Sequence, residues 1–398
     1  MGLNDTVSAE RLHIAFFGMR NAGKSSLVNA VTNQQLAVVS DVKGTTTDPV
    51  KKAMELLPLG PVVIIDTPGY DDEGELGELR VKKTREILRK TDIAVLVLEA
   101  GKQPSVQDKE LLQFFEKNKI PFITVYNKAD LAQDVQYTEG IVVSTVTGQG
   151  VEELKTALAN ISKTLKKDKR IVADLINEGD VVVLVTPIDE SAPKGRLILP
   201  QQMTIRDILD SGATSVVCQV PQLESVLDGF KKPPEMVITD SQAFGKVSGI
   251  VPKDIPLTSF SILMARYKGE LTKVIKGAAV LSTLTDSDKV LICEGCTHHR
   301  QCNDIGTVKM PQWIREHCGH NPEFHFTSGG DFPEDLTQYK VIVHCGGCML
   351  GDTQMKYRSE QAQIQGVDMV NYGIAIAAMK GILKRSTQLF DEVKDMVR

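Results

Sequence analysis

The apolar run near the N-terminus, with the loop that follows it, constrains the fold of this chain more than any other feature. Leu12–Phe17 is a candidate buried strand, and residues 18–25 read GMRNAGKS directly after it. A GxxxxGKS loop between a strand and a helix binds phosphates, because its glycines let backbone N–H groups wrap around them. We therefore predict a helix over residues 26–32, with Lys24 reaching the β and γ phosphates of a nucleotide and Ser25 binding Mg²⁺.

Two further motifs lie where a phosphate-binding domain needs its metal ligands. Asp66 ends the apolar run 62–65, and Gly69 follows in the sequence DTPG. A carboxylate at a strand end can hold the water shell of Mg²⁺, and the backbone N–H of Gly69 can turn towards the γ phosphate. Thr46 lies in the loop between the first helix and the second strand, from which we expect it to reach Mg²⁺.

The next pair of motifs predicts that the base is guanine. The apolar run 122–126 leads into Asn127-Lys128-Ala129-Asp130, where the Asp130 carboxylate can bind two N–H groups of guanine and reject adenine. Ser144 follows the run 141–143 and supplies the last loop that contacts the base. The predicted catalytic residues are Lys24, Ser25, Thr46, Asp66 and Gly69; the predicted nucleotide contacts are Gly18, Asn21, Ala22, Gly23, Lys24, Ser25, Ser26, Asn127, Lys128, Asp130 and Ser144.

This N-terminal segment resembles the Era/TrmE-type branch of the translation-factor class of GTPases. Asn21 lies where potassium-activated members of that branch place a K⁺-binding asparagine, so the resemblance implies that K⁺ supplies charge an arginine finger gives elsewhere. The alternative is that Asn21 only caps the loop. Tyr70 stands where Ras-like proteins carry a water-positioning glutamine. Because a phenol orients water poorly, we predict slow intrinsic GTP hydrolysis.

Cysteine and histidine crowd into the C-terminal part of the chain. Six of the seven cysteines and six of the seven histidines lie after residue 290. Thiolates bind zinc and iron well, and a CxxC turn lets two sulfurs converge on one centre. A structural zinc site would use the same donors, whereas disulfides are disfavoured because nothing else in the sequence indicates an oxidising compartment.

Two of these groups follow apolar runs that we expect to be strands. The run 289–292 ends in Cys293 and Cys296, and the run 341–343 ends in His344, Cys345 and Cys348. If the two strands are parallel neighbours, their C-terminal tips converge and distant cysteines meet. We also predict a helix over 311–317, a strand over 323–326, and helices from about 353 and 372 whose positive ends would face an anionic cluster. The glycines between Cys345 and Cys348 favour an iron–sulfur cluster, without excluding zinc.

The segment between these regions carries folding signals but no catalytic cluster. We predict strands at 181–185, 197–199 and 215–220 and a short helix at 205–210, with further alternation to residue 247. The charged stretch 163–170 is expected to be a solvated helix end, and Cys218 to pack in the core. We interpret this segment as an interaction or dimerisation module.

The combination of motifs resembles the HydF family, the maturation GTPases of [FeFe]-hydrogenases. A GTPase segment, an α/β middle and Cys296-x-His298 followed by His344-Cys345-x-x-Cys348 carry the resemblance over the whole chain. It implies a [4Fe–4S] cluster on Cys296, Cys345 and Cys348. It further implies a scaffold that receives a diiron precursor bearing CO and CN⁻ from radical-SAM maturases and passes it to the apo-hydrogenase.

The identity of the fourth cluster ligand stays open from the sequence. His298 and His344 are candidates for it, or for hydrogen bonding around the cluster. Cys293 and Cys302 lie outside the family motif, and the resemblance points away from both. We expect surface or packing roles for His299, His317, Cys318, His320 and His325.

The expected architecture is α/β with three domains. Residues 1–168 form a P-loop GTPase with a doubly wound sheet, 169–265 a small α/β dimerisation domain, and 266–398 an α/β cluster-binding domain. The net charge of −5 argues against nucleic acid as a partner, and without an N-terminal apolar segment or a run of about 20 apolar residues we expect a cytoplasmic protein without membrane contact. The family resemblance and the middle segment without catalytic residues imply a homodimer. The alternatives are an RNA-modification or ribosome-assembly GTPase with a zinc module, and a regulatory GTPase whose cysteines only stabilise a fold.

Overall fold

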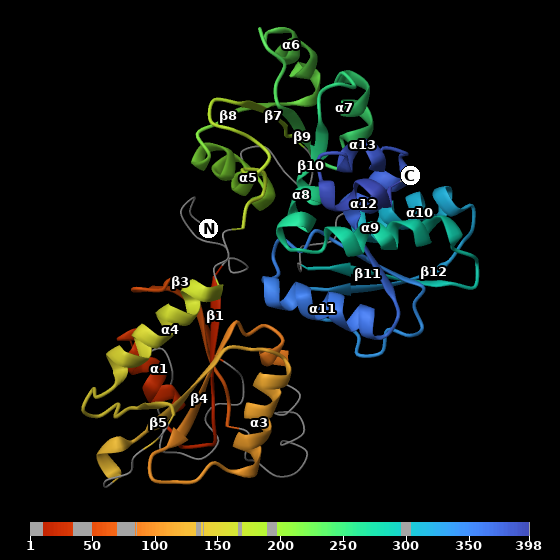
Figure 1. Cartoon of the computed structure of the whole chain (residues 1–398). Coiled ribbons are helices and arrows are strands. Elements are labelled where there is room, and N and C mark those ends of the chain that lie inside the picture. Colours follow the sequence, from red (N-terminus) through yellow and green to blue (C-terminus); the bar gives the residue numbers. More distant parts are fainter. Residues whose placement is uncertain are drawn as a thin grey trace. The chain divides into compact units, whose positions relative to one another are not determined.

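The computed structural model divides into two compact units, residues 1–168 and 169–398 (Figure 1). It describes residues 11–34, 50–69, 84, 86–132, 137, 139–165, 169–188, 197–295 and 304–397. Several residues that carry predictions lie outside the described residues, namely Thr46, Tyr70, Cys296, His298, His299 and Cys302.

A six-stranded sheet forms the centre of the first unit, in the order β2-β3-β1-β4-β5-β6. Only β2 is antiparallel to its neighbour; the other pairs are parallel. The central strands are apolar on both faces because helices cover both sides. The strands are β1 (Leu12–Phe17), β2 (Val50–Leu56), β3 (Gly60–Asp66), β4 (Ile93–Glu99), β5 (Phe122–Asn127) and β6 (Ile141–Val142).

The helices of the first unit lie on opposite faces of this sheet. Figure 1 shows α1 (Lys24–Thr32) and α4 (Val151–Leu165) on one side and α3 (Val106–Lys117) on the other. Each face of the sheet has its own hydrophobic core. On one face, Ile14 of β1 packs in a core with Leu27 of α1; on the other face, Phe17 of β1 packs in a core with Phe115 of α3. The buried strand predicted at Leu12–Phe17 is confirmed, and α1 begins two residues earlier than expected.

The second unit contains two four-stranded parallel sheets. The first has the order β10-β9-β7-β8, with β7 (Val181–Val185), β8 (Thr214–Cys218), β9 (Met236–Thr239) and β10 (Leu257–Ser259). Its helices are α5 (Leu199–Asp210), α6 (Leu223–Asp228) and α7 (Phe244–Ile250). The predicted strand at 197–199 is wrong, because helix α5 begins at Leu199 with Pro200 in its first turn, where the missing N–H of proline is harmless.

The second sheet has the order β12-β11-β13-β14 and carries the cysteine-rich segments. Its strands are β11 (Lys289–Glu294), β12 (Glu323–Ser328), β13 (Val341–His344) and β14 (Asp368–Asn371). Figure 1 shows α9 (Leu271–Val280) and α11 (Asp352–Ile364) on opposite faces of it. The remaining helices are α8 (Phe260–Tyr267), α10 (Met310–Cys318), α12 (Tyr372–Met379), α13 (Leu383–Thr387) and a π-helical turn, η5 (Ile305–Lys309).

One hydrophobic core joins both sheets of the second unit. It includes Val183 of β7, Ile262 of α8 and Val343 of β13. The segments 169–265 and 266–398 thus share a core. The chain is held where it enters this unit, because the Asp207 carboxylate accepts the backbone N–H groups of Ile171, Val172 and Ala173 at 3.0, 2.8 and 2.8 Å.

Within the described ranges, no helix combines the length and the apolar character needed to span a bilayer.

Candidate functional site

Two glycines allow the loop after β1 to pack closely against neighbouring strands. Gly18 has φ +150°, and a Cβ there would lie 2.3 Å from the carbonyl oxygen of Val97. Gly23 has φ +87°, and its Cβ would lie 2.2 Å from Nδ2 of Asn127. Any larger residue would push the loop off the sheet, so the phosphate-binding shape depends on both positions.

Hydrogen bonds of the phosphate-binding loop hold Lys24 in place and connect the loop to Asn127 of the base-binding motif. Lys24 Nζ donates to the carbonyl oxygens of Gly18 and Met19 at 2.8 and 2.9 Å, so the ammonium lies over the loop where phosphates would bind. The buried Asn127 donates through Nδ2 to the carbonyl of Ala22 at 3.1 Å. The structure therefore brings the two predicted nucleotide motifs together.

Ser25 and Asp66 form a pair of oxygen donors at the end of β3. Ser25 Oγ donates to Oδ2 of Asp66 at 2.6 Å, and Oδ1 of Asp66 is buried without a hydrogen-bond partner among the described residues. Burial raises the pKa of Asp66, and the bond from Ser25 and the charge of Lys24 oppose that shift. A buried carboxylate oxygen left open beside a hydroxyl fits Mg²⁺, which prefers oxygen ligands.

The base-binding loops also converge. Ser144 Oγ donates to Oδ1 of Asp130 at 2.5 Å, and Lys128 Nζ pairs with Oε2 of Glu99 at 3.1 Å. Asn21 is exposed with φ 60°, a geometry compatible with a cation ligand and with a loop cap alike.

In the second unit, parallel pairing brings the two cysteine segments to one edge of the sheet. Strands β11 and β13 pair in parallel with Cys293 opposite His344, which confirms the expected neighbourhood. Beyond the strands, the backbone N–H of Gly295 donates to Sγ of Cys345 at 2.9 Å. The residue directly before Cys296 therefore contacts the sulfur of Cys345.

Backbone donors and glycines shape the loop 345–348. Sγ of Cys345 accepts a second N–H from Gly347 at 3.4 Å. Surrounding protein raises the pKa of the Cys345 thiol to about 11, an effect that the N–H groups of Gly295 and Gly347 oppose. Gly347 has φ +63°, and a Cβ there would lie 2.6 Å from Sδ of Met355, whereas a Cβ on Gly346 would meet nothing within 4 Å. This open, donor-lined side suits a bulky cluster bound by thiolates.

His344 is buried, with both ring nitrogens in hydrogen bonds. Nδ1 lies 2.7 Å from the carbonyl oxygen of Cys345, and Nε2 lies 2.9 Å from Nη1 of Arg358. Burial lowers the pKa of His344 to about 3, so the ring is neutral near pH 7. Because Arg358 can only donate, Nε2 is the acceptor and Nδ1 carries the proton. This favours a hydrogen-bonding role over direct cluster ligation.

Cys293 points away from this edge. It packs in a small core with Leu291 and Ile342, while Cys345 packs against the core on the other face of the sheet. Thr327 Oγ1 donates to Sγ of Cys293 at 3.2 Å, and burial raises the pKa of this thiol to about 12. That Cys293 is not a cluster ligand stays a prediction.

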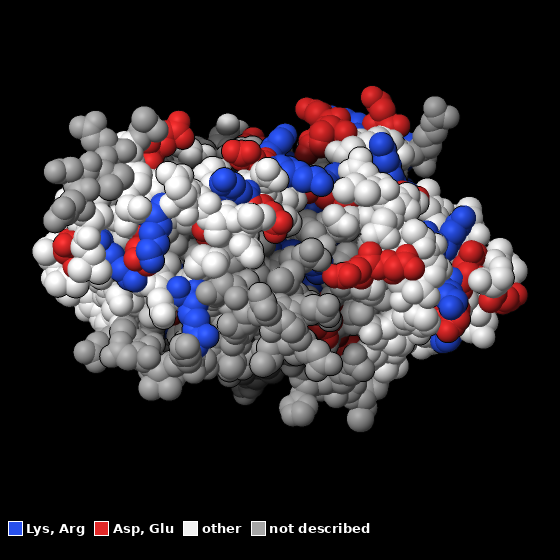
Figure 2. Space-filling view, turned by 90° about the horizontal axis from the view of Figure 1, so that it is seen from below, with Lys and Arg blue, Asp and Glu red and all other residues white. Residues whose placement is uncertain are grey.

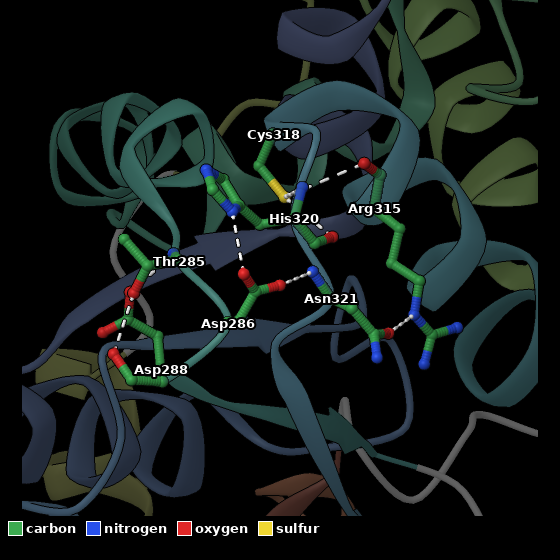
Figure 3. A network of polar contacts seen from close by, with 8 residues as sticks. Thr285, Asp286, Asp288, Arg315, Cys318, His320 and Asn321 are labelled. Carbon is green, nitrogen blue, oxygen red and sulfur yellow. Dashed lines mark hydrogen bonds and ion pairs between the residues drawn. The ribbon is translucent and has the colours of Figure 1, made fainter.

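Other cysteines and histidines lie at the opposite, amino-terminal edge of the same sheet (Figure 3). There Asp286 accepts the backbone N–H of Asn321 at 2.7 Å and lies 3.2 Å from Nδ1 of His320. Sγ of Cys318 accepts the backbone N–H of His320 at 3.4 Å. These contacts hold the turn after α10, as expected for surface or packing residues.

Charges of both signs are mixed on the face of the molecule in Figure 2. Lys and Arg side chains alternate with Asp and Glu among the described residues in view, without one basic stripe. A stripe of that kind is the electrostatic signature of nucleic-acid binding.

The loop after β1, the Ser25–Asp66 pair and the convergent Asn127 and Asp130 loops define the class of the first unit as a P-loop GTPase domain. Residues 13–128 match the family model described as 50S ribosome-binding GTPase. Residues 171–269 match the hydrogen maturase F dimerization domain, and residues 272–389 match the hydrogen maturase F tetramerization domain. These two models together cover more than half of the 398 residues, and the chain belongs to the hydrogen maturase F (HydF) family.

Curated relatives match mainly through the GTPase region. The tRNA modification GTPase MnmE of Thermoanaerobacter sp. (strain X514) is 35% identical over 162 residues, which is 38% of this chain and 35% of that protein. GTPase Der of Kosmotoga olearia is 27% identical over 220 residues, 50% of this chain and 49% of that protein. The chain thus spans about a third to a half of these relatives.

Solved structures are similar at a low level. Aquifex aeolicus Era bound to GDP and AlF₄⁻ is 19% identical, covering 52% of this chain and 91% of that one, with a TM-score of 0.35. The G domain of the T. maritima FeoB iron transporter is 24% identical, covering 38% and 99%, with a TM-score of 0.30.

Two residues beside the cysteine loop had no prediction from the sequence. Arg358 is 1% exposed and contacts His344, and the buried Lys268 donates from Nζ to the carbonyl of Leu350 at 2.8 Å. No local sequence pattern marks either one, because a lone basic residue in or after a helix usually lies in solvent.

Proposed function

We propose that this protein is a GTPase that carries a [4Fe–4S] cluster on Cys296, Cys345 and Cys348. It would assemble or deliver the diiron precursor, with its CO and CN⁻ ligands, during [FeFe]-hydrogenase maturation. Membership of the HydF family and the geometry around Cys345 support this function. Its partners would be radical-SAM maturases and the apo-hydrogenase, and its location the cytoplasm.

The observation that carries the cluster proposal is the hydrogen bond from Gly295 N–H to Sγ of Cys345. Cys296 follows Gly295 in the sequence and Cys348 closes the CxxC turn after Cys345, so we propose that these three cysteines bind one cluster. Three protein ligands leave one iron open for a small ligand or a guest unit. When bound, the cluster would supply that open iron; the chain supplies the thiolates, the N–H donors and the neutral His344 beside them.

For GTP hydrolysis, we propose that the first unit acts mainly by positioning. Ser25, Asp66 and Thr46 would hold Mg²⁺, which neutralises charge on the β and γ phosphates. Lys24 would move from the loop carbonyls to the phosphates, and the Asp130 carboxylate would bind guanine. Asn21 would bind K⁺. The turnover would be slow, because Tyr70 replaces a water-positioning amide.

We further propose that the chain forms a homodimer through residues 169–265. This segment lies almost wholly within the part that matches a dimerization-domain model. Strand β8 is the edge of its sheet, and Val217 on that strand is 45% exposed, a feature that isolated chains usually avoid. We also propose that residues 1–168 form the GTPase domain and that residues 266–398 form the cluster-binding domain.

Metal analysis under anaerobic conditions tests the cluster. Wild type, Cys296→Ala, Cys345→Ala and Cys348→Ala would be analysed for iron, sulfide and zinc, with EPR of the dithionite-reduced protein. We expect about four irons per chain in wild type and loss of the [4Fe–4S] signal in each variant. Cys318→Ala, which changes a cysteine at the opposite sheet edge, is the control and should keep its iron. One zinc per chain without an EPR signal would instead favour the RNA-modification or regulatory GTPase.

Steady-state hydrolysis tests the nucleotide site separately. Lys24→Ala should abolish GTP hydrolysis, and exchanging K⁺ for Na⁺ should slow the wild type. In Asn21→Ala the rates in K⁺ and Na⁺ should become equal while GDP affinity is kept. An unchanged K⁺ response in this variant would mean that Asn21 only caps the loop.

A further inference from the structure

We propose that Arg358 is a positioning residue for the cluster: through His344 it fixes the Cys345 loop, and its guanidinium supplies a buried positive charge that balances the anionic cysteine ligands. The inference rests on the proposed function and goes beyond the ligand set that the family resemblance implies.

Arg358 is a buried cation that bonds to carbonyl oxygens and to His344, while the charge of Asp331 acts on it without a direct ion pair among the described residues. Its side chain is the largest of those fully buried among the described residues, at 1% exposure, and belongs to the buried face of α11. Nη2 donates to the carbonyl oxygen of Gly329 at 2.6 Å, and the guanidinium lies 5.1 Å from the ring centre of Phe332. Among the described residues, it forms no ion pair with a carboxylate. Burying an unpaired charge is costly, so a compensating anion is expected nearby.

The nearest candidates for that anion are the thiols at the carboxyl end of the sheet. Burial lowers the pKa of Arg358, and the thiols of Cys293 and Cys345 and the carboxylate of Asp331 oppose that shift when ionised. Cys293 is closed in an apolar core with Thr327. Cys345 lies on the loop that faces open space at Gly346. A cluster bound by Cys345 would bring the missing negative charge.

A two-step hydrogen-bond chain connects Arg358 to the ligand loop. Nη1 of Arg358 donates to Nε2 of His344 at 2.9 Å, and Nδ1 of His344 donates to the carbonyl of Cys345 at 2.7 Å. The first bond fixes the tautomer that makes the second possible. The orientation of the Cys345 peptide therefore depends on a residue on another element.

A second buried cation lies beside the other end of the loop. Lys268 Nζ donates to the carbonyl of Leu350 at 2.8 Å and lies 3.5 Å from Oδ1 of Asp352. Burial lowers the pKa of Lys268, and the charge of Asp352 is the main opposing influence. Lys268 forms an ion pair with Asp352, whereas Arg358 forms none among the described residues, so Arg358 is the cation that we assign to balance the cluster.

The reduction potential of the cluster tests the charge directly. Reduction adds one negative charge, which a buried cation stabilises, so removing Arg358 should make reduction harder. The variants are Arg358→Met, which removes the charge at similar volume, and Arg358→Lys, which keeps it. Arg315→Met removes an exposed arginine from the opposite sheet edge and is the matched control.

Each loaded protein would be titrated anaerobically, with EPR as the readout and circular dichroism as the check of folding. For Arg358→Met we expect the reduction equilibrium to fall about tenfold, which is ~59 mV for a one-electron couple. Arg358→Lys should recover most of this shift, and Arg315→Met should change the equilibrium less than twofold. An unchanged potential in Arg358→Met with full iron content would overturn the charge-balancing role.

Variants of His344 test the hydrogen bonds from Arg358 to Cys345 even if Arg358→Met does not fold. An asparagine nitrogen can replace Nδ1 as a donor to Cys345, and a glutamine oxygen can replace Nε2 as an acceptor from Arg358. Each variant keeps one of the two hydrogen bonds and loses the other, so both should hold less iron than wild type. Wild-type iron content and potential in both variants would show that the loop does not depend on the hydrogen bonds through His344.

A cluster-free measurement separates this inference from the proposed function. Long-range ¹⁵N–¹H NMR of the metal-free wild type should show His344 as the Nδ1–H tautomer. The Nε2–H tautomer would overturn the chain. If wild type binds no iron but shows the Nδ1–H tautomer, the proposed function and the charge-balancing role fail, and the structural chain from Arg358 to Cys345 stands.

Discussion

The two edges of the β11–β14 sheet carry the same kinds of side chain and use them differently. At the amino-terminal edge, Cys318 and His320 lie in a turn whose polar groups bind one another in solvent (Figure 3). At the carboxyl-terminal edge, the sulfur of Cys345 accepts backbone N–H groups. The ring of His344 donates to the Cys345 carbonyl and accepts from the buried Arg358. The first edge forms its polar contacts within the turn, whereas the second holds a buried cation and a single sulfur that accepts two backbone N–H groups.

The comparison shows that residue type alone does not identify a metal site. Exposed pairs such as His320 with Asp286 gain little, because water screens them and competes for the same bonds. A buried cation such as Arg358 is costly unless its charge is balanced. Burial without a matching partner therefore separates a candidate site from a structural turn.

The largest expected effect compares two glycines with positive φ, one at each edge. Gly319 ends α10 with φ +74° and has open space around it, whereas Gly347 has φ +63° and lies against Met355. Gly319→Ala should lower the free energy of unfolding by about 1 kcal/mol from backbone strain alone. Gly347→Ala should lower it by about 2–4 kcal/mol, because Met355 must also move.

Urea unfolding followed by tryptophan fluorescence measures both variants. The single tryptophan, Trp313, lies on α10 and so reports on the second unit only. Iron content is the second readout, and we expect a severalfold loss in Gly347→Ala alone. Equal destabilisation and equal iron in the two variants would mean that the two edges tolerate a side chain alike.

A smaller effect compares two cysteines that we do not assign as ligands. Cys293 is 0% exposed, so Cys293→Ser places a hydroxyl in an apolar core and should destabilise the second unit by about 1–3 kcal/mol. Cys318→Ser changes a partly exposed residue and should stay within about 0.5 kcal/mol of wild type. Both should keep the iron content of wild type. Loss of iron in Cys293→Ser, with the fold intact, would make Cys293 a ligand.

The smallest effect concerns pH at the amino-terminal edge. The backbone N–H of Asn321, and then His320, lower the pKa of Asp286 below its ordinary 3.8. The folded state therefore binds this proton less readily than the unfolded chain, and the resulting stability is present above about pH 4 and lost below it. Asp286→Asn should make the urea midpoint less sensitive to pH between about 4 and 3. An identical slope in wild type and variant would contradict this assignment.

Much of this architecture could be predicted from the sequence. Leu12–Phe17, apolar apart from His13, and the apolar run Val181–Val185 are predicted as strands, and their bounds agree with β1 and β7. The loop 18–25 is recognisable because its chemistry depends on residues adjacent in sequence. The strand predicted at 197–199 failed because a short apolar run does not distinguish a strand from the first turn of a helix.

The contacts that complete the candidate cluster site could not be predicted in the same way. Spacing alone leaves Cys293 and Cys296 as equal alternatives, and the structure separates Cys293 from Cys345 because the pleat directs them to opposite faces. Arg358 comes from a helix that packs on the sheet from one side. Its meeting with His344 depends on tertiary packing, for which one sequence offers no pattern.

The hydrogen bonds to the Asp207 carboxylate determine where a fragment of this protein should begin. Three successive backbone N–H groups, from Ile171 to Ala173, end on that one side chain. A fragment that starts at residue 174 would lack Ile171 to Ala173. The Asp207 carboxylate would then lose three hydrogen bonds, and the core would lose Ile171 and Val172. A fragment that starts at Lys169 keeps these hydrogen bonds. The cluster half of the protein should therefore be isolated with the residues before Ile171 attached, and its metal chemistry studied apart from GTP.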